Sequence, residues 1–243
     1  LVSSCKEIPK DCADVKGGSA IINEFGFCVE GDTGLHENFH GFIEDVDGNK
    51  YTTVKIGNQI WMSENLRTKH YQDGSEIDIV FLNNNNEYLD RINKTIYQGG
   101  YYNWYSIEGK NICPKGWHVP TFNDYNVLYD YFENNSKNEI GSKLCKFGSN
   151  ESGFSASLTA WSGGNGIYYF GGDETKYTDH IFYWTSTESE DKKSTVGKYK
   201  AYRFHIKVSD FGKGSPRAEK LTWRELHNKS SGLCIRCIKD END

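Results

Sequence analysis

The seven cysteines of this 243-residue chain restrict its fold more than any other residue type. A set this dense is unusual for a cytosolic protein and typical of chains that fold in oxidising compartments, where cysteines pair as disulfides. Because the number is odd, one cysteine is left over. The seven are Cys5, Cys12, Cys28, Cys113, Cys145, Cys234 and Cys237. We therefore predict three disulfides in an exported chain.

The leftover cysteine is Cys5. Residues 1–5 read Leu-Val-Ser-Ser-Cys, which resembles the lipobox of bacterial lipoproteins, where the cysteine is acylated after signal cleavage. The alternative is a free or intermolecular cysteine. No apolar run approaches the roughly 20 residues that a membrane helix needs. A lipid on Cys5 is therefore the membrane attachment that we expect.

Residues 1–40 predict a Cys/Gly-rich spacer of the kind seen in bacterial surface lipoproteins. They carry too little apolar material for a core, and Cys12 and Cys28 predict a disulfide that closes a small loop. Acidic side chains surround this loop, and their oxygens suit calcium. These candidate ligands are Asp11, Asp14, Glu30 and Asp32. The alternative is a solvated, turn-rich spacer without metal, and no other cofactor is predicted.

The rest of the chain, residues 41–243, is predicted to form one domain. Only 36% of the residues are hydrophobic, but 14% are aromatic, and rings bury much area per residue. The 25 glycines fit loops that bend around these bulky side chains. A net charge of −6 excludes a general electrostatic attraction to nucleic acid.

Local patterns predict an α+β fold with short antiparallel sheets and one or two helices. Residues 51–56 and 59–62 predict a β-hairpin, and residues 63–66 predict a helical turn. A helix should begin after Pro120, capped by Thr121 with Asp124 in the capping-box position. Its apolar stripe is Tyr125, Leu128, Tyr129 and Phe132. Residues 182–187, 200–206 and 232–238 predict strands.

Several long blocks of the sequence resemble the Fibrobacter succinogenes major paralogous domain family. The first block, at 47–67, reads Asp-Gly-Asn-x-Tyr-x-Thr-Val-Lys-Ile-Gly-x-Gln-x-Trp-Met-x-Glu-Asn-Leu-Arg. The others are Tyr-Asn-Trp-Tyr at 102–105, Cys-Pro-Lys-Gly-Trp-His-Val-Pro-Thr at 113–121, Glu-Ser-Gly-Phe at 151–154, Tyr-Trp-Thr-Ser-Thr-Glu at 183–188 and Ile-Arg-Cys-Ile at 235–238. The resemblance runs from about residue 43 to residue 239. It implies a loop-rich, C-type-lectin-like fold related in architecture to sulfatase-modifying factors. It also implies a secreted or surface-anchored setting in Gram-negative bacteria.

The same resemblance implies a bond between Cys113 and Cys237, which leaves Cys145 and Cys234 as a further pair. Side chains alternate along a strand, so Cys234 and Cys237 should face opposite sides and need different partners. Two alternatives are a redox Cys-x-x-Cys motif and a zinc site made by all four cysteines. The strand-like context disfavours the first, and the wide spacing of Cys113 and Cys145 disfavours the second.

No catalytic constellation is predicted, so we expect the chain not to be an enzyme. The seven histidines show no zinc-binding spacing, and neither a Gly-x-Ser-x-Gly elbow nor a P-loop is present. The sugar-binding strings of animal C-type lectins, Glu-Pro-Asn, Gln-Pro-Asp and Trp-Asn-Asp, are also absent. The lectin resemblance therefore concerns the fold and carries no sugar specificity.

An aromatic cluster is the predicted ligand-binding surface. Trp161, Tyr168, Tyr169 and Phe170 flank a Gly-Gly-Asn-Gly turn at 163–166. Exposed rings on such a loop suit stacking on sugars or gripping a protein, whereas the alternative is that they fill the core beneath the loop.

These features together predict a non-catalytic adhesion module that binds a protein or glycan through its loops. It would be lipid-anchored on the extracellular face of the outer membrane, or secreted. One alternative is a structural accessory subunit that contacts other outer-membrane proteins. A second alternative is an oxidase-like enzyme related to sulfatase-modifying factors.

Overall fold

The protein has an α+β fold built from short antiparallel sheets and, within the described part, two α-helices, which confirms the predicted fold class. The computed structural model describes residues 8–77, 79–81, 99–133, 140–146, 148–157, 161–162, 168–169, 180–190, 197–207, 217–218 and 226–241. No helix within these ranges is long and apolar enough to cross a membrane.

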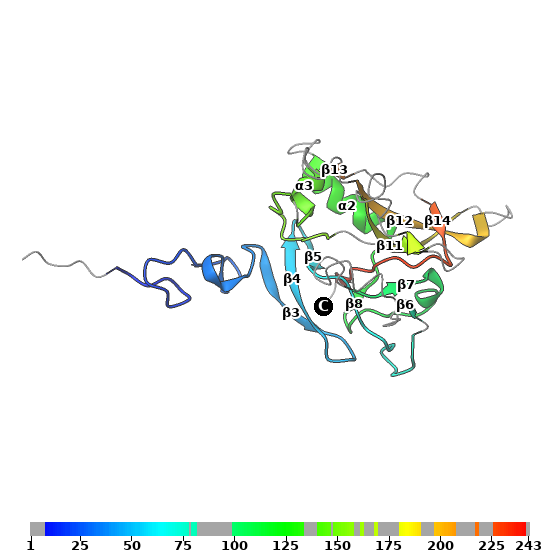
Figure 1. Ribbon diagram of the computed structural model, residues 1–243, viewed down its shortest axis with the longest axis horizontal. Helices are drawn as coiled ribbons and strands as arrows, with labels where there is room; N and C mark the ends of the chain where they lie inside the picture. Colours follow the sequence, from blue (N-terminus) through cyan, green and yellow to red (C-terminus); the bar gives the residue numbers. More distant parts are fainter. Residues whose placement is uncertain are drawn as a thin grey trace, which may run out of the picture.

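A five-stranded sheet forms one half of the main body (Figure 1). Its strands, in spatial order, are β3 (Phe39–Glu44), β4 (Lys50–Ile56), β5 (Gln59–Met62), β15 (Ile238–Lys239) and β8 (Trp117–His118). The predicted hairpin is confirmed as β4 and β5, with Val54 opposite Trp61. The Asp-Gly turn before β4 places Gly48 at φ +78°, a conformation that glycine adopts without strain.

A second sheet is centred on two long strands that pair along most of their length. It contains β11 (His180–Glu188), β12 (Lys200–Lys207), β13 (Arg217–Ala218) and β14 (Leu226–Asn228). Three two-stranded sheets are β1 (Ile21–Ile22) with β2 (Cys28–Val29), β6 (Ile79–Phe81) with β7 (Tyr101–Tyr102), and β9 (Trp161–Ser162) with β10 (Tyr168–Tyr169). The predicted strands at 182–187 and 200–206 are therefore confirmed.

Two hydrophobic cores lie on opposite faces of these strands. Along β11, Ile181 and Tyr183 enter one core, whereas Phe182 and Trp184 enter the other. This alternation follows from the two-residue side-chain period of a strand. Both faces of β11 are buried at residues 181–184, and this stretch is accordingly apolar at every position.

The helices cover the first core. α2 (Phe122–Glu133) begins directly after Thr121, and α3 (Ile140–Leu144) follows it in the chain. The Asp124 amide donates to the Thr121 hydroxyl at 3.2 Å, and the Thr121 amide donates to the Asp124 carboxylate at 2.7 Å. This reciprocal pair confirms the capping box. Tyr125, Leu128 and Phe132 are buried and Tyr129 packs beside them, as the apolar stripe predicts.

Residues 233–238 connect the two large sheets. The amides of Met62, Leu66 and Tyr102 donate to the carbonyls of Cys237, Ile235 and Leu233, respectively. The Trp184 amide donates to the carbonyl of Cys234, at 3.0 Å. The predicted strand at 232–238 is therefore only partly right: regular pairing is confined to β15, and residues 233 and 234 form isolated bridges to different neighbours.

The predicted helical turn at 63–66 is wrong. This segment has no helical hydrogen bonds, because the Leu66 amide pairs with the Ile235 carbonyl at 2.8 Å and the Ser63 amide with the Thr52 carbonyl at 2.9 Å. Pairing with a distant part of the chain thus replaces the local pattern.

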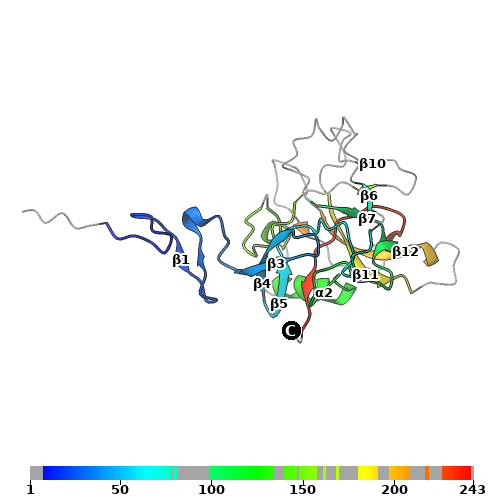
Figure 2. The ribbon, with the colours of Figure 1, turned by 90° about the horizontal axis from the view of Figure 1, so that it is seen from below.

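The N-terminal residues 8–38 extend away from the sheets, as both ribbon views show (Figures 1 and 2). The predicted Cys12–Cys28 disulfide is present and closes the loop that precedes β2. The Asn23 side chain donates to the carbonyls of Glu37 and Phe39, at 3.0 and 2.8 Å, and so fixes this loop to the start of β3. Ile21 and Ile22 are more than half exposed.

Candidate functional site

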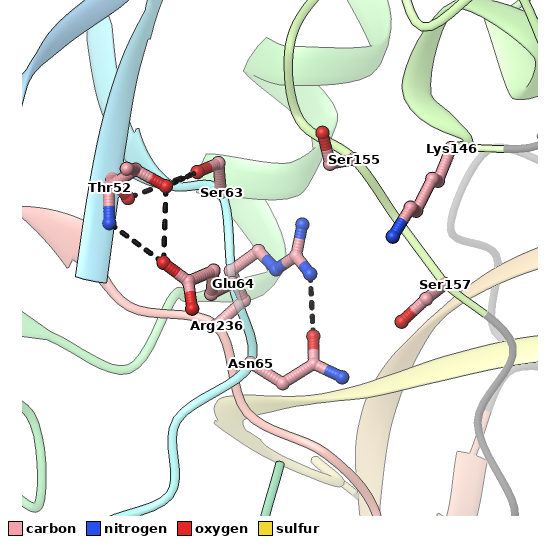
Figure 3. A pocket seen from close by; sticks show the side chains of 8 residues that line it. All are labelled: Thr52, Ser63, Glu64, Asn65, Lys146, Ser155, Ser157 and Arg236. Atoms are coloured by element: carbon pink, nitrogen blue, oxygen red, sulfur yellow. Dashed lines mark hydrogen bonds between the residues drawn. The ribbon is translucent and has the colours of Figure 1, made fainter. Parts of the chain in front are cut away.

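A polar cavity of about 160 Å³ lies where the chain leaves β5 and approaches β15. Its walls come from five separate segments of the sequence. The lining residues are Thr52, Ser63, Glu64, Asn65, Lys146, Ser155, Ser157 and Arg236 (Figure 3). Hydroxyl and charged groups dominate this surface, so the cavity suits a polar ligand.

Arg236 reaches the cavity because its neighbours are fixed on both sides. The carbonyls of Ile235 and Cys237 accept bonds from Leu66 and Met62, so the segment at 63–65 lies next to Arg236. Side chains at 233, 235 and 237 enter the second core, whereas Cys234 and Ile238 enter the first. Arg236 falls on the face of Cys234 and Ile238, where its guanidinium lies against the rings of Phe154 and Tyr183.

The guanidinium of Arg236 is buried, with 1% of the residue exposed. One terminal nitrogen donates to Asn65 Oδ1 at 2.6 Å, and the other donates to the Phe154 carbonyl. The group also lies 4.5 Å from the ring centre of Phe154 and 5.1 Å from that of Tyr183. Cation–π contacts of this kind stabilise a desolvated cation.

These contacts leave the positive charge uncompensated. Within the described residues, no carboxylate forms an ion pair with Arg236, and Nε has no hydrogen-bond partner. Buried charges in proteins are normally paired, since removing an ion from water costs several kcal/mol (order of magnitude). A buried guanidinium without an anion at the edge of a cavity is therefore the most informative feature of the site.

The opposite wall of the cavity carries a second cation. A parallel bridge joins Cys145 to Ala156, and the Lys146 amide donates to the Ala156 carbonyl at 2.9 Å. This pairing places the Lys146 side chain beside Ser155 and Ser157, with its ammonium directed toward the Arg236 guanidinium (Figure 3). Lys146 is exposed, so its charge is accessible to a ligand.

Ser155 is held in the left-handed region at φ +53°, which is uncommon for a residue other than glycine. The Asn150 side chain stabilises this conformation, because its Oδ1 accepts from the Ser155 amide at 2.9 Å and its Nδ2 donates to Ser155 Oγ at 3.0 Å. The hydroxyl is thereby fixed at the cavity wall.

Glu64 does not neutralise the two cations, because its carboxylate is engaged elsewhere. One oxygen accepts from the Thr52 amide at 3.0 Å and from the Thr52 hydroxyl at 3.2 Å. The other oxygen pairs with Arg67 at 3.0 Å. Of the charged residues that line the cavity, Arg236 and Lys146 are thus the two whose charge Glu64 does not pair with.

A second cavity, of about 190 Å³, lies where the N-terminal segment meets α2 and α3. Its lining includes Glu37, Lys55, Tyr131 and Lys143. Here Lys143 pairs with Glu151 at 3.1 Å, so the buried cation has its own anion. The contrast with Arg236 makes the first cavity the stronger candidate.

The predicted Cys145–Cys234 disulfide is absent, whereas the implied Cys113–Cys237 bond is present. Cys234 and Cys237 do face opposite sides, because Cys234 lies in the first core and Cys237 in the second. Cys145 shares the core of Cys234 but remains a free thiol. Each of the two is tied to a different neighbour, Cys145 to Ala156 and Cys234 to Tyr183, so their backbones are positioned independently.

Burial also makes these two thiols unreactive. It raises the pKa of Cys145 to about 12, against the smaller opposing effect of the Arg236 charge. The pKa of Cys234 likewise rises to about 12 through burial, although Arg236 and hydrogen bonds with Tyr101 and Asn65 act in the other direction. Thiolates are the species that form disulfides, bind metals and attack substrates. At neutral pH both groups are therefore protonated thiols.

Three of the four acidic residues predicted to bind calcium have other partners in the structure. Asp11 accepts from the amides of Ala13, Val15 and Ala20, each at 2.9 Å. Asp14 pairs with Lys10, and Glu30 accepts from the Glu37 amide at 2.8 Å. Asp32 lies in a short 3₁₀ turn. Among the residues that the structure describes, no three His, Cys, Asp or Glu side chains form a group that could hold a metal ion.

The predicted aromatic surface is described only in its backbone. Tyr169 lies opposite Trp161 in the β9–β10 pair, so the backbones of these two residues are adjacent. Their side chains, Phe170 and the turn at 163–167 lie outside the described residues, as does Cys5 with its predicted lipid.

Sequence reasoning identified the blocks that contain Asn65 and Arg236 but assigned neither residue a role. A single arginine between two strand cysteines suggests no ligand, and Lys146 and Ser157 lie in no recognisable motif. The sequence feature that could have indicated Arg236 is its position inside the apolar run Leu-Cys-Ile-Arg-Cys-Ile at 233–238. Charged side chains are rarely buried unless they are paired, so an arginine in such a run suggests a partner or a ligand.

Comparison with known proteins places most of the chain, and most of the cavity, in one family. The family described as the Fibrobacter succinogenes major domain matches residues 54–239, a range that includes every cavity residue except Thr52. No curated protein and no solved structure matches the sequence. Since the match spans well over half of the 243 residues, the chain belongs to the Fibrobacter succinogenes major domain family.

Proposed function

We propose that this protein is a non-catalytic binding module of the bacterial surface. It would be held on the extracellular face of the outer membrane by a lipid on Cys5, or be secreted, and would recognise a glycan or protein. The ligand would enter the Arg236 cavity, and the C-type-lectin-like loops that carry Trp161 and Tyr168 would extend the contact.

The observation that carries this proposal is the uncompensated Arg236 charge at a polar cavity. If a bound ligand supplies the missing anion, the buried Arg236 guanidinium has a role that explains why the fold retains it. Fixed hydroxyls and an accessible Lys146 provide the remaining polar contacts. Pre-formed polar groups of this kind orient a ligand without requiring chemistry.

The oxidase-like alternative has less support. Copper–thiolate chemistry needs ionisable, accessible thiols, but Cys145 and Cys234 are buried with pKa values of about 12. The remaining described cysteines are held in two disulfides.

One observation favours the accessory-subunit alternative. Ile21, Ile22 and Phe42 expose 52%, 59% and 64% of their surfaces on the N-terminal segment and β3. Exposed apolar side chains suit a protein contact. Affinity purification from native membranes tests this alternative, because a structural subunit should return the same partners in a fixed ratio.

A binding screen tests the main proposal. The full chain is applied to a glycan array and to outer-membrane extract, with calcium and with a chelator, beside the Lys146→Glu variant. We expect saturable binding that charge reversal at Lys146 weakens at least tenfold, while Lys115→Glu, an exposed site outside the cavity, has no effect. Binding that is insensitive to Lys146→Glu would place the site elsewhere. Loss of binding in chelator would support the calcium prediction.

A further inference from the structure

We propose that the Arg236 cavity binds the acidic group of an anionic sugar, with the sugar ring seated among the surrounding hydroxyls. This inference rests on the proposed binding function and specifies the ligand of the same site. It depends on three independent properties of the cavity: its unused donors, its charge and its size.

Unused donors are the first property. A guanidinium carries five N–H donors in a rigid planar fork. Only two are used in the described structure, by Asn65 Oδ1 and by the Phe154 carbonyl, which leaves three. An oxyanion satisfies several such donors at once, and charge-assisted bonds of this type are shorter and stronger than those between neutral groups.

The second property is the charge around the guanidinium. Lys146 adds a positive charge on the facing wall, and the Glu64 carboxylate is already engaged by Thr52 and Arg67. An anion between the two cations therefore meets two attractive groups and no free carboxylate among the lining residues. A neutral sugar would leave the Arg236 charge uncompensated, so the site should reject it relative to an acidic one.

The third property is the size of the cavity. Its volume of about 160 Å³ exceeds what a carboxylate or sulfate alone requires. A protein cavity of about 150 Å³ accommodates a six-membered ring. The walls that surround this volume present the hydroxyls of Ser63, Ser155 and Ser157. Ser63 and Ser155 already donate to the carbonyls of Thr52 and Gly153, so they offer acceptor lone pairs to ring hydroxyls. A pyranose that carries an oxyanion thus matches the cavity better than an extended acidic side chain does.

Calorimetric titration of the full, disulfide-bonded chain tests this inference. The probes are trigalacturonic acid, its methyl ester, a trisaccharide of sulfated galactose and a hexaglutamate peptide. We expect one of the two acidic sugars to bind at least tenfold more tightly than the methyl ester, and the comparison of uronate with sulfate identifies the acidic group. Raising the salt concentration should weaken this binding.

Variants locate the binding. Lys146→Gln should reduce the affinity for the acidic sugar about tenfold and leave the weak binding of the methyl ester unchanged, whereas Lys115→Gln should alter neither. Lys146 is exposed, so this substitution should not affect folding. Arg236→Lys should also reduce the affinity for the acidic sugar. Circular dichroism and the unfolding midpoint of this variant show whether it still folds.

Three outcomes would overturn the inference. Equal affinity for the acid and its methyl ester would show that charge is not recognised, while the binding function itself would stand. Equal or tighter binding of the hexaglutamate peptide would identify a protein ligand instead. Failure of both acidic sugars to bind would reject the ligand class, and the glycan and membrane screen would then decide separately whether the protein binds anything.

Discussion

Arg236, Cys145 and Cys234 share one apolar environment and respond to it in opposite ways. A thiol avoids the cost of burial by staying protonated, so both cysteines become small, inert core residues. A guanidinium keeps its proton under all ordinary conditions and must be stabilised by contacts instead. Asn65, the Phe154 carbonyl and two aromatic rings supply these contacts, yet they leave part of the group unsatisfied.

The burial of the two thiols predicts their reactivity. In the native protein, Cys145 and Cys234 should not react with a maleimide reagent over hours at pH 7. Unfolding in guanidinium without reductant should expose both, which mass spectrometry would detect as two added labels in the peptides containing residues 145 and 234. Fast labelling of either cysteine in the native state, or no labelling after unfolding, would contradict the structure.

His118 makes stability depend on pH. Its imidazole lies between the carboxylates of Asp124 and Asp240. The hydrogen bond with Asp124 raises the pKa of His118 above the usual 6.5. Burial lowers this pKa, and the hydrogen bond with Asp240 raises it further. Since the folded-state pKa is the higher one, this contribution to stability is fully present below pH 6.5 and is lost as pH rises through the folded-state pKa.

Thermal unfolding between pH 5.5 and 8.5 measures this effect. His118→Gln should lower the melting temperature most at the acidic end of this range, and the difference from the native protein should shrink toward pH 8.5. A difference that is constant with pH would mean that His118 acts only through packing. Asp240→Asn provides the matched test, because it removes one partner and keeps the ring.

At the scale of secondary-structure elements, patterns that are satisfied locally could be predicted and patterns that depend on distant pairing could not. The β4–β5 hairpin and α2 carry their own turn, cap and apolar stripe, so the sequence suffices for them. Residues 63–66 and 233–236 take their conformation from each other and from Tyr102 and Trp184. The cavity is assembled from these same segments, which explains why its residues could not be predicted as a site.

The capping box of α2 predicts the effect of a single substitution. Thr121→Ala removes the hydroxyl that accepts from the Asp124 amide and should lower the free energy of unfolding by about 1 kcal/mol. For a chain of this size, this corresponds to a fall of roughly 2–4 °C in melting temperature. Asn123→Ala, at an exposed position of the same turn, should change stability much less. Equal effects of the two substitutions would argue against the cap.

For the whole molecule, the two disulfides have unequal consequences because they close loops of different length. Cys113 and Cys237 are 124 residues apart, whereas Cys12 and Cys28 are 16 apart. The entropy that a cross-link removes from the unfolded chain grows with loop length, to about 3 kcal/mol for a 15-residue loop and about 4.7 kcal/mol for a 100-residue loop.

Paired alanine variants test this difference. Cys113→Ala with Cys237→Ala should lower the free energy of unfolding by about 4–5 kcal/mol, measured by guanidinium titration of tryptophan fluorescence. Cys12→Ala with Cys28→Ala should cost less, and its effect should concentrate on hydrogen exchange within residues 8–38. A larger global loss from the second pair would show that the N-terminal segment is integral to the main body.

The position of residues 233–238 between the two sheets also sets when folding can finish during biosynthesis. When synthesis has reached residue 231, every strand of the two large sheets except β15 has been made. The segment whose carbonyls accept hydrogen bonds from the amides of Met62, Leu66, Tyr102 and Trp184 has not. The nascent chain therefore lacks these contacts until residues 233–238 have been made. The Cys113–Cys237 disulfide can likewise form only after this segment has been made, so the long covalent loop closes after the strands that it encloses.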